Sequence, residues 1–407
     1  MTRFPKAFAF ALCLAVRAPA QPGPAQQEAR GVWIHTNDFD ADAAKGREQI
    51  DRLVQNLADA NFNLLLPFVN SDYLVALDHP EYQQKHPNAK WDALGYLIQQ
   101  AEKRRLAVHL WYGFTGGRHP DSSDYDPKVG GSPKWAAKRV DEVVPGYPIA
   151  RATLAAPGMA ELERLPIWKM KQISIPLPES RPMRDVCPQH ADARAWQLNL
   201  LRRALERYAW VSGIHVEEPG YTFPGSCVCD LCRSTFEILH HKKLLDNLDS
   251  LEAQDFRTLG TGAFMAELYT MLRNRDSRFQ LSCNGSPNWV TDRRFLGRNW
   301  AIWAKLQKLS FFVPMNYTAD PNGFRSRLDL TMKGLTADTP VYAGIGILWS
   351  GHPDSNISTA TILNEIESSR RRGAKGVILF YDGALNNEIY DALKNGPFQS
   401  HVLLPNE

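Results

Sequence analysis

The chain of 407 residues is 44% hydrophobic and 22% charged, a composition typical of a globular protein and unlike that of a disordered or fibrous one. Its formal net charge is +3, but three of its 47 basic residues and none of its acidic residues lie in the first twenty positions. The remaining 44 basic and 44 acidic residues balance. Without a long run of lysine and arginine, this charge pattern gives no electrostatic case for a nucleic-acid partner or an anionic membrane surface.

The first twenty residues have the layout of an export signal. Two basic residues precede an apolar run at 7–16, and small residues follow it at 18–20. This order predicts a signal peptide at 1–20, and the apolar run is too short to span a bilayer. We therefore expect a secreted or periplasmic protein without stable membrane insertion, although Arg17 beside the cleavage site leaves an uncleaved anchor open. Residues 21–29 are predicted to be a disordered lead-in.

From Arg30 onward, short apolar segments alternate with segments of helical periodicity. Eight buried strands, each followed by a helix, predict an α/β fold, a single (β/α)8 TIM barrel over 30–407, with its active site at the carboxyl ends of the strands. An open doubly wound sheet is the alternative, but no Gly-rich phosphate-binding turn follows any strand. The predicted strands lie at 31–36, 62–69, 106–112, 212–218, 279–284, 309–316, 340–348 and 376–381, and helical spacing is clearest at 50–57, 91–101, 263–272 and 360–371.

The longest interruption of this pattern, at 115–190, follows the third predicted strand. It is rich in glycine, proline and charge, and it contains Trp135 and Trp168. A loop this long inside a compact domain is usually either functional or disordered. On a barrel it would lie over the mouth, so we predict a substrate-binding or lid insertion, with disorder as the alternative.

The fourth predicted strand ends in two adjacent acids, Glu217 and Glu218. Alternate side chains of a strand share a face, so His215 and Glu217 should point to one side and Glu218 to the other. Because burial of an unpaired charge is costly, two acids at the end of a buried strand favour a functional role. We predict Glu217 as the catalytic centre, held by a hydrogen bond from His215, with Glu218 in a structural or catalytic role. If Pro219 ends the alternation one residue early, the two glutamates exchange roles.

Polar and aromatic residues follow the other predicted strands. Sugars stack on aromatic rings and bond through their hydroxyl groups, and glycosidic cleavage uses two carboxyl groups that flank the bond. Asp320 is the preferred second catalytic carboxylate and Asp382 the next, although either could instead cap a helix. The predicted substrate-binding residues are Trp33, His35, Asp38, Asn70, Trp111, His215, Asn284, Asn316, Tyr317, Trp349, Tyr381 and Asp382, of which Trp33, Trp111, Tyr317, Trp349 and Tyr381 are the candidate sugar platforms.

Motifs in order along the chain carry a resemblance to a known family. They are Arg30-Gly-Val-Trp-Ile-His, Asn61-Phe-Asn-Leu-Leu-Leu-Pro, Gly213-Ile-His-Val-Glu-Glu-Pro-Gly-Tyr, Val313-Pro-Met-Asn-Tyr and Val341-Tyr-Ala-Gly-Ile-Gly. The chain resembles the glycosyl-hydrolase-like family 10 proteins from about Arg30 to Asp382. The resemblance implies an exported bacterial (β/α)8 enzyme, of a kind that in some members cleaves peptidoglycan glycan strands. That family usually has two aspartates where this chain has its two glutamates.

A second resemblance is local. Cys227-Val-Cys-Asp-Leu-Cys232 is similar to the Cys-x-Cys-x-x-Cys zinc cluster of family 42 β-galactosidases, where a further upstream cysteine completes the site. This implies a structural zinc held by Cys187, Cys227, Cys229 and Cys232, since four thiolates form a closed tetrahedral site. Disulfide pairing is the alternative that export permits, although five mature cysteines cannot all pair. Cys283 lies in a predicted strand and is expected to be a small buried residue.

Together these features predict an exported glycoside hydrolase of an oligo- or polysaccharide, with peptidoglycan glycan strands as one candidate and no organic cofactor. The sequence does not specify the oligomeric state. One alternative is a carbohydrate-binding barrel without catalysis, which needs no second carboxylate near Glu217. Another is a metal-dependent hydrolase that uses His35, Asp38 and His215 and loses activity on chelation.

Overall fold

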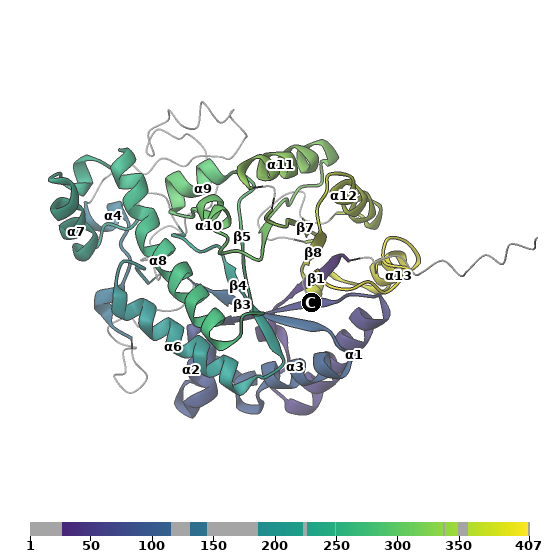
Figure 1. Cartoon of the computed structure of the whole chain (residues 1–407). Coiled ribbons are helices and arrows are strands. Elements are labelled where there is room, and N and C mark those ends of the chain that lie inside the picture. Colours follow the sequence, from purple (N-terminus) through teal and green to yellow (C-terminus); the bar gives the residue numbers. More distant parts are fainter. Residues whose placement is uncertain are drawn as a thin grey trace, which may run out of the picture.

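The computed structural model describes residues 27–114, 131–144, 186–222, 226–248, 250–336, 338–348 and 357–405. Within these ranges the chain forms a barrel of parallel strands surrounded by helices (Figure 1). All eight predicted strands are confirmed, each within a few residues of its expected position. They are β1 (Ala29–Ile34), β2 (Leu64–Asn70), β3 (Ala107–Gly113), β4 (Val211–Glu217), β5 (Gln280–Gly285), β6 (Phe311–Pro314), β7 (Tyr342–Gly346) and β8 (Gly376–Phe380).

The sheet closes on itself. Its hydrogen-bonded order is β6-β5-β4-β3-β2-β1-β8-β7, and all the paired strands are parallel. Parallel bridges from Phe312 to Val341 and from Met315 to Gly344 join the two ends of this order, β6 and β7. A closed parallel sheet is a (β/α)8 barrel, so the predicted barrel is confirmed and the doubly wound alternative is wrong.

Helices cover the outside of the barrel (Figure 1). The first of them, α1, is typical: it buries Ile50, Val54 and Leu57 at helical spacing, and the Asp42 side chain caps its amino end. The helices are α1 (Ala43–Asp59), α2 (Ser71–Asp78), α3 (Ala93–Lys103), α4 (Val140–Val143), α6 (Ala191–Arg207), α7 (Asp230–His240), α8 (Leu251–Arg275), α9 (Trp289–Leu296), α10 (Trp300–Lys305), α11 (Pro321–Gly334), α12 (Thr359–Arg371) and α13 (Asn387–Asn395). Short 3-10 helices are η1 (Thr36–Asp38), η2 (Pro80–Tyr82), η3 (Pro87–Trp91), η4 (Pro133–Trp135), η6 (Leu244–Asp246) and η7 (Asp382–Ala384).

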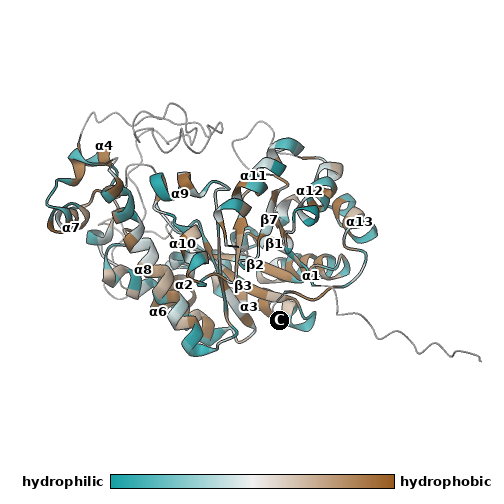
Figure 2. Ribbon diagram, turned by 45° about the horizontal axis from the view of Figure 1, so that its top comes forward, coloured by the Kyte–Doolittle hydropathy of each residue, from teal (hydrophilic) through white to brown (hydrophobic). Residues whose placement is uncertain are grey.

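Apolar side chains fill both sides of the strands, which are mostly hydrophobic in Figure 2. The outer layer packs the strands against the helices and includes Ile214 and Val216 of β4. The inner layer fills the barrel, where the rings of Phe311 and Tyr342 stack with centroids 4.2 Å apart. A barrel of this size is thus a packed core whose chemistry is limited to its rim.

A separate small core lies beside the carboxyl end of β4. It joins the four cysteines of the predicted metal site to Tyr221, Phe236 and Phe256, and Figure 1 shows α4 and α7 outside the main ring of helices. The described ends of the predicted insertion, 131–144 and 186–190, contribute to it through bridges from Ala136 to Val186 and from Arg139 to Ser226. The centre of the insertion lies outside the described residues.

The amino end of the barrel begins earlier than expected. Ala29 is the first residue of β1, and Gln27 bridges to Leu403, so residues 27–29 belong to the folded domain and not to a disordered lead-in. The reason is the Glu28 carboxylate, which accepts hydrogen bonds from Arg30 and Arg370 at 2.7–2.8 Å. The predicted export signal lies outside the described residues. Within them, no helix is long and apolar enough to cross a membrane.

Candidate active site

The two glutamates predicted as the centre of the site lie at the carboxyl end of β4, as the chain order requires. Strand alternation directs Ile214 and Val216 to the outer layer. His215 faces the barrel interior, where its ring lies 5.9 Å from Trp33 and 6.2 Å from Phe311, centroid to centroid. Glu217, the last residue of β4, is on the same side as His215. Its carboxyl group therefore emerges at the rim of the barrel interior.

Two side chains from neighbouring strands hold the Glu217 carboxyl group. Trp111 of β3 donates its indole N–H to Oε2, and Asn284 of β5 donates its amide N–H to the same oxygen at 2.6 Å. Among the described residues, no group donates to the other oxygen, Oε1. One oxygen is thus fixed in position, while the other remains free to exchange a proton with a bound molecule.

The surroundings of Glu217 change its acidity. Burial and, to a lesser extent, the negative charge of Glu218 raise the pKa of Glu217 to about 7. The hydrogen bonds from Asn284 and Trp111 and the positive charge of Arg298 lower it, but by less. A carboxyl group with this pKa is partly protonated near neutral pH. It can therefore both donate and accept a proton there, which an ordinary surface glutamate does not do.

Glu218 does not continue the strand. Its φ of 37° lies in the left-handed region, which is uncommon for a residue with a side chain and marks a strained turn. Its backbone N–H donates to Asn284 Oδ1 at 2.6 Å, so one asparagine bonds to both glutamates. Its carboxylate accepts a hydrogen bond from Arg298 Nη1 at 2.5 Å. The two carboxyl groups thus have different partners: Trp111 and Asn284 for Glu217, and Arg298 for Glu218.

Aromatic rings surround this rim, but not all of them can serve as sugar platforms. Trp33 and Trp111 are 0% and 4% exposed, so their faces are covered by neighbouring side chains. His35 lies 5.3 Å from Trp111 and 4.5 Å from Tyr381, while Tyr317 stacks on Phe380 at 5.2 Å, all between ring centroids. Tyr317 and Tyr381 are half-buried and keep part of their surface open. Trp349 lies outside the described residues.

His215 does not hold Glu217, contrary to the sequence-based expectation. Its Nδ1 atom lies 2.9 Å from Ser282 Oγ, and its pKa is well below the usual value because of burial and the nearby His109. Two residues along a strand correspond to about 6.6 Å of rise, so the His215 ring lies one layer deeper than the carboxyl group. It is a neutral core residue, and Trp111 and Asn284 take the role expected of it.

The two predicted partner aspartates have different surroundings. Asp320 is exposed and caps α11, where its two oxygens accept the N–H groups of Asn322 at 3.0 Å and Gly323 at 2.8 Å. Asp382 is half-buried, and its Oδ1 accepts the backbone N–H of His35 at 3.1 Å. Burial raises the pKa of Asp382 to about 6, against that hydrogen bond. The contacts therefore associate Asp382 with the aromatic rim and explain Asp320 as a helix cap.

Three other predicted binding residues lie at the same end of the barrel. Asn70 caps α2 by accepting the N–H of Tyr73 at 2.9 Å, and Asp38 is exposed in η1. Asn316 is fully buried after β6, and its side-chain amide has no hydrogen-bond partner among the described residues. The same is true of Trp33 Nε1 and His35 Nδ1. Buried polar atoms of this kind require a partner, which a bound molecule or water can supply.

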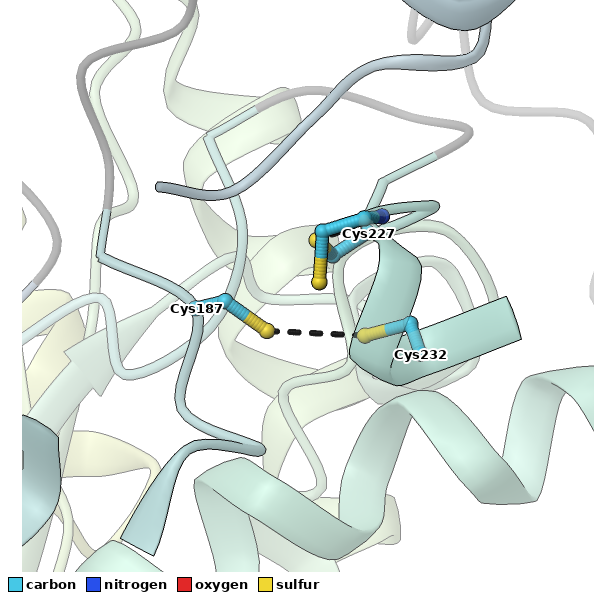
Figure 3. A group of neighbouring side chains, drawn as sticks. Cys187, Cys227 and Cys232 are labelled. Carbon is cyan, nitrogen blue, oxygen red and sulfur yellow. Dashed lines mark hydrogen bonds between the residues drawn. The ribbon is translucent and has the colours of Figure 1, made fainter. Parts of the chain in front are cut away.

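The four cysteines of the predicted metal site come together beside this rim. Figure 3 shows the sulfur atoms of Cys187, Cys227 and Cys232 directed toward one another, and the Cys187 and Cys232 sulfurs are 3.5 Å apart. All four ligand atoms lie within 4.8 Å of one another, and all four residues are buried and free of disulfide bonds. Zinc–sulfur bonds of ~2.3 Å in a tetrahedron place sulfur atoms about 3.8 Å apart. The cluster therefore has the donor set and the spacing of a four-thiolate metal site.

Backbone N–H groups add to this cluster. Lys138 and Cys229 donate to the Cys227 sulfur at 3.2 and 3.4 Å, a contact that favours a thiolate. Within the described ranges, these four cysteines are the only set of three or more histidine, cysteine or acidic side chains close enough to share a metal ion. His35, Asp38 and His215 are not such a set, so the geometry does not support the metal-hydrolase alternative.

Some residues of the site were not predicted from the sequence. Arg298, between α9 and α10, pairs with Glu218, and Asp292 of α9 lies behind it. No sequence pattern around Arg298 and Asp292 indicates their place in the site, because it depends on tertiary contacts with the end of β4. A buried arginine beside an acid-rich strand end is visible only in the folded protein.

No family model and no curated protein matches this sequence. The structure is similar to that of the PgaB (BpsB) glycoside hydrolase domain from Bordetella bronchiseptica, with 12% identity, a TM-score of 0.61, and coverage of 90% of this chain and 98% of that one. It is also similar to β-galactosidases from the psychrophilic Marinomonas ef1 (10% identity, TM-score 0.55, coverage 91% and 58%) and Bacillus circulans sp. alkalophilus (13%, 0.53, 87% and 50%). The chain thus spans about half the length of these galactosidases. At such identities, the likeness establishes the fold alone.

Proposed function

We propose that this protein is a glycoside hydrolase and that Glu217 is its proton donor. The observation that carries the proposal is the state of the Glu217 carboxyl group: it ends a barrel strand, has a pKa of about 7, is fixed through one oxygen and is open at the other. Active sites of such barrels lie at this end of the strands. The fold shared with glycoside hydrolases supports the proposal.

In the proposed reaction, protonated Glu217 donates its proton to the glycosidic oxygen as the bond to the sugar breaks. The hydrogen bonds from Trp111 and Asn284 to Oε2 strengthen as the carboxylate forms, and so favour the transition state. Water then forms the new bond to the anomeric carbon. If the second carboxylate has first formed a glycosyl ester, Glu217 takes the proton of this water; in a direct displacement the second carboxylate takes it, and Glu217 recovers its proton from solvent. Burial is the main cause of the raised pKa that makes this exchange possible near neutral pH.

For the second carboxyl group we propose Asp382 ahead of Asp320, the reverse of the order favoured by the sequence. Asp382 lies two residues after the end of β8, and its carboxylate accepts the backbone N–H of His35, whose ring lies against Trp111. Asp320 uses both oxygens to cap a helix and is exposed. Asp382 is therefore the better candidate for the base or nucleophile opposite Glu217.

We propose an oligo- or polysaccharide as the substrate. Tyr317 and Tyr381 offer partly open rings, and the half-buried Glu217 and Asp382 offer carboxyl oxygens. These are the contacts that sugars use. Peptidoglycan glycan strands remain one candidate because of the motif resemblance, and residues 115–190 remain a proposed substrate-binding insertion.

Two further proposals accompany this function. The four cysteines bind a structural zinc ion, since four thiolates leave no open position for catalysis. The protein is exported, which the first twenty residues predict. Determination of the amino-terminal residue of the protein purified from its natural host tests export directly, because cleavage after residue 20 leaves Gln21 first.

The experiment is a substrate screen followed by one substitution. Wild-type protein is incubated with denuded peptidoglycan and with common plant and bacterial polysaccharides, and new reducing ends are measured. Glu217→Gln should lower the rate on the cleaved substrate by at least about 100-fold while the unfolding temperature is unchanged, because the amide cannot transfer a proton. If Glu217→Gln keeps the wild-type rate, the proposed mechanism is wrong. If wild type binds a polysaccharide and cleaves none of those tested, the non-catalytic binding barrel replaces it.

A further inference from the structure

A buried ion-pair network lies behind the two glutamates, with Arg298 at its centre. Arg298 is 5% exposed. Its Nη1 atom lies 2.5 Å from Glu218 Oε1 and 3.6 Å from Asp292 Oδ1, and its Nη2 atom donates to the Tyr221 carbonyl at 3.5 Å. Asp292 is 0% exposed, and its other oxygen accepts N–H groups from Ser286 and Trp300. The proposed function does not use any of these contacts.

The backbone is shaped to hold Arg298 there. Gly297 ends α9 with a φ of 65°, where a Cβ atom would lie 2.9 Å from the Arg257 carbonyl oxygen, and so the chain turns back toward β4. Gly220 passes directly over the arginine, since a Cβ atom there would lie 2.2 Å from Arg298 Cγ. Tyr221 N–H bonds to the Leu296 carbonyl at 2.7 Å. The segment after Glu218 is thus packed onto the arginine over several residues.

The charges in this network do not balance. Three carboxyl groups, those of Glu217, Glu218 and Asp292, share one guanidinium group, which is always charged. Arg298 forms its shortest ion pair with Glu218. Burial, with a contribution from the Glu218 charge, raises the pKa values of both Glu217 and Asp292 to about 7. Because Arg298 pairs most closely with Glu218, a second buried negative charge is only partly compensated, so both groups are partly protonated near neutral pH.

The other titratable groups that face the network stay neutral. Burial raises the pKa of the Cys283 thiol on β5 and of the Tyr317 hydroxyl after β6 well above their usual values. His215 is neutral because burial lowers its pKa. The distribution of protons at the rim therefore depends on the three carboxyl groups and on Arg298.

We infer that Arg298 is a positioning residue that holds the Glu218 side chain in a direct ion pair, away from the Glu217 carboxyl group, and thereby leaves Glu217 as the proton donor of the pair. The inference rests on the proposed function for its catalytic meaning, but its electrostatic content is independent of any substrate. Without the guanidinium group, the two adjacent glutamates share a proton, and neither is a defined donor.

The experiment follows the ionisation of Glu217 itself. Infrared spectra of the carboxyl C=O band are recorded from pH 4 to 10 for wild type and variants, and the band absent from Glu217→Gln is assigned to Glu217. In wild type this band should titrate at about 7. Arg298→Gln should raise the midpoint by about one unit, and Glu218→Gln should lower it by about one unit, because a charge this close shifts a pKa by about 1–3 units. Arg298→Lys should restore most of the wild-type midpoint.

A double substitution separates this role from a merely structural one. Loss of the direct charge of Arg298 should raise the midpoint in either background, but sharing of a proton requires both glutamates. The Glu217 band should therefore titrate in two steps in Arg298→Gln and in one step in the Arg298→Gln/Glu218→Gln double variant, and a single step in both overturns the inference. Arg370→Gln is the matched control, since it removes another partly buried arginine, one that pairs with Glu28 at the opposite end of the barrel. It should lower the unfolding temperature and leave the Glu217 midpoint unchanged.

The results also separate this inference from the proposed function. A Glu217 midpoint that is the same in wild type, Arg298→Gln and Glu218→Gln overturns the inference, as does an Arg298→Lys variant that titrates like Arg298→Gln. If Arg298→Gln does not fold, Arg298→Met, which keeps an unbranched side chain without the charge, takes its place in the same titrations. Hydrolysis that survives Glu217→Gln overturns the proposed function and leaves these titrations as they are.

Discussion

Replacement of Trp111 by phenylalanine should make Glu217 a weaker acid. The indole N–H of Trp111 is one of two hydrogen bonds to Glu217 Oε2, and it lowers the pKa of this carboxyl group by favouring the charged form. A hydrogen bond to a charged group contributes about 1.5–3 kcal/mol, and one pKa unit corresponds to about 1.4 kcal/mol. The loss is therefore worth about one to two units. The lower figure applies because Asn284 keeps its bond at 2.6 Å.

The sign of the effect on the rate follows from the role of Glu217 as proton donor. The protonated form is active, so activity falls as the pH rises through its pKa, which is about 7 in wild type and should be about 8 in Trp111→Phe. The assay is the pH dependence of kcat/KM on the cleaved polysaccharide between pH 5 and 10. The alkaline limb should move upward by about one unit, while activity at pH 6 stays within a few-fold of wild type.

Trp210→Phe is the matched control for this variant. Trp210 also donates its indole N–H, but to the neutral carbonyl of Leu106, at 2.8 Å. It lies immediately before β4, at the opposite end of the strand from Glu217. Its replacement should lower the unfolding temperature without a shift of the alkaline limb. An unmoved limb in Trp111→Phe, or equal shifts in both variants, would refute the reasoning.

Three other outcomes are expected. Purified protein should contain about one zinc per chain, and Cys229→Ser should lose it and unfold at a lower temperature, whereas Cys283→Ser, at a buried cysteine outside the cluster, should keep it. Asp382→Asn should lower kcat by about 100-fold or more. Asp320→Ala should retain kcat and lower the free energy of unfolding by about 1 kcal/mol, as the loss of a helix cap does. The reverse result restores Asp320 as the partner of Glu217. Glu365→Gln should flatten the dependence of the unfolding temperature on pH. Burial raises the pKa of Glu365 from 4.5 to about 9. The protonated side chain therefore contributes its full share to the stability of the folded protein below pH 4.5, and this contribution is lost as the pH rises through 9.

The fold could be predicted because its signals are local. Each strand is an apolar run whose ends are marked by a change of periodicity, and Ile50, Val54 and Leu57 define the buried face of α1 without reference to any other segment. The order of strands in a parallel barrel then follows from the order in the chain. The first residue of the folded domain was predicted less exactly, because it depends on contacts between residues far apart in the chain, such as that of Glu28 with Arg370.

The site could be predicted in position but not in detail. Glu217, Asn284 and Trp111 were all expected at the rim, since residues that end parallel strands meet there. Their roles were not, because burial decides them: Trp111 is 4% exposed and serves as a hydrogen-bond donor, not as a sugar platform. His215 was assigned to Glu217 from spacing alone, while the depth of its layer directs it to Ser282.

The acidity of Glu217 depends on residues that are far apart in the chain. Trp111 comes from β3, Asn284 from β5 and Arg298 from the segment after α9. The small core that contains the cysteines meets the same network at Tyr221, which lies in that core and accepts a hydrogen bond from Arg298. The cluster therefore fixes one end of the segment that begins at Glu218. For this reason, loss of the proposed metal should affect the position of the charge beside Glu217 as well as the stability of the outer core.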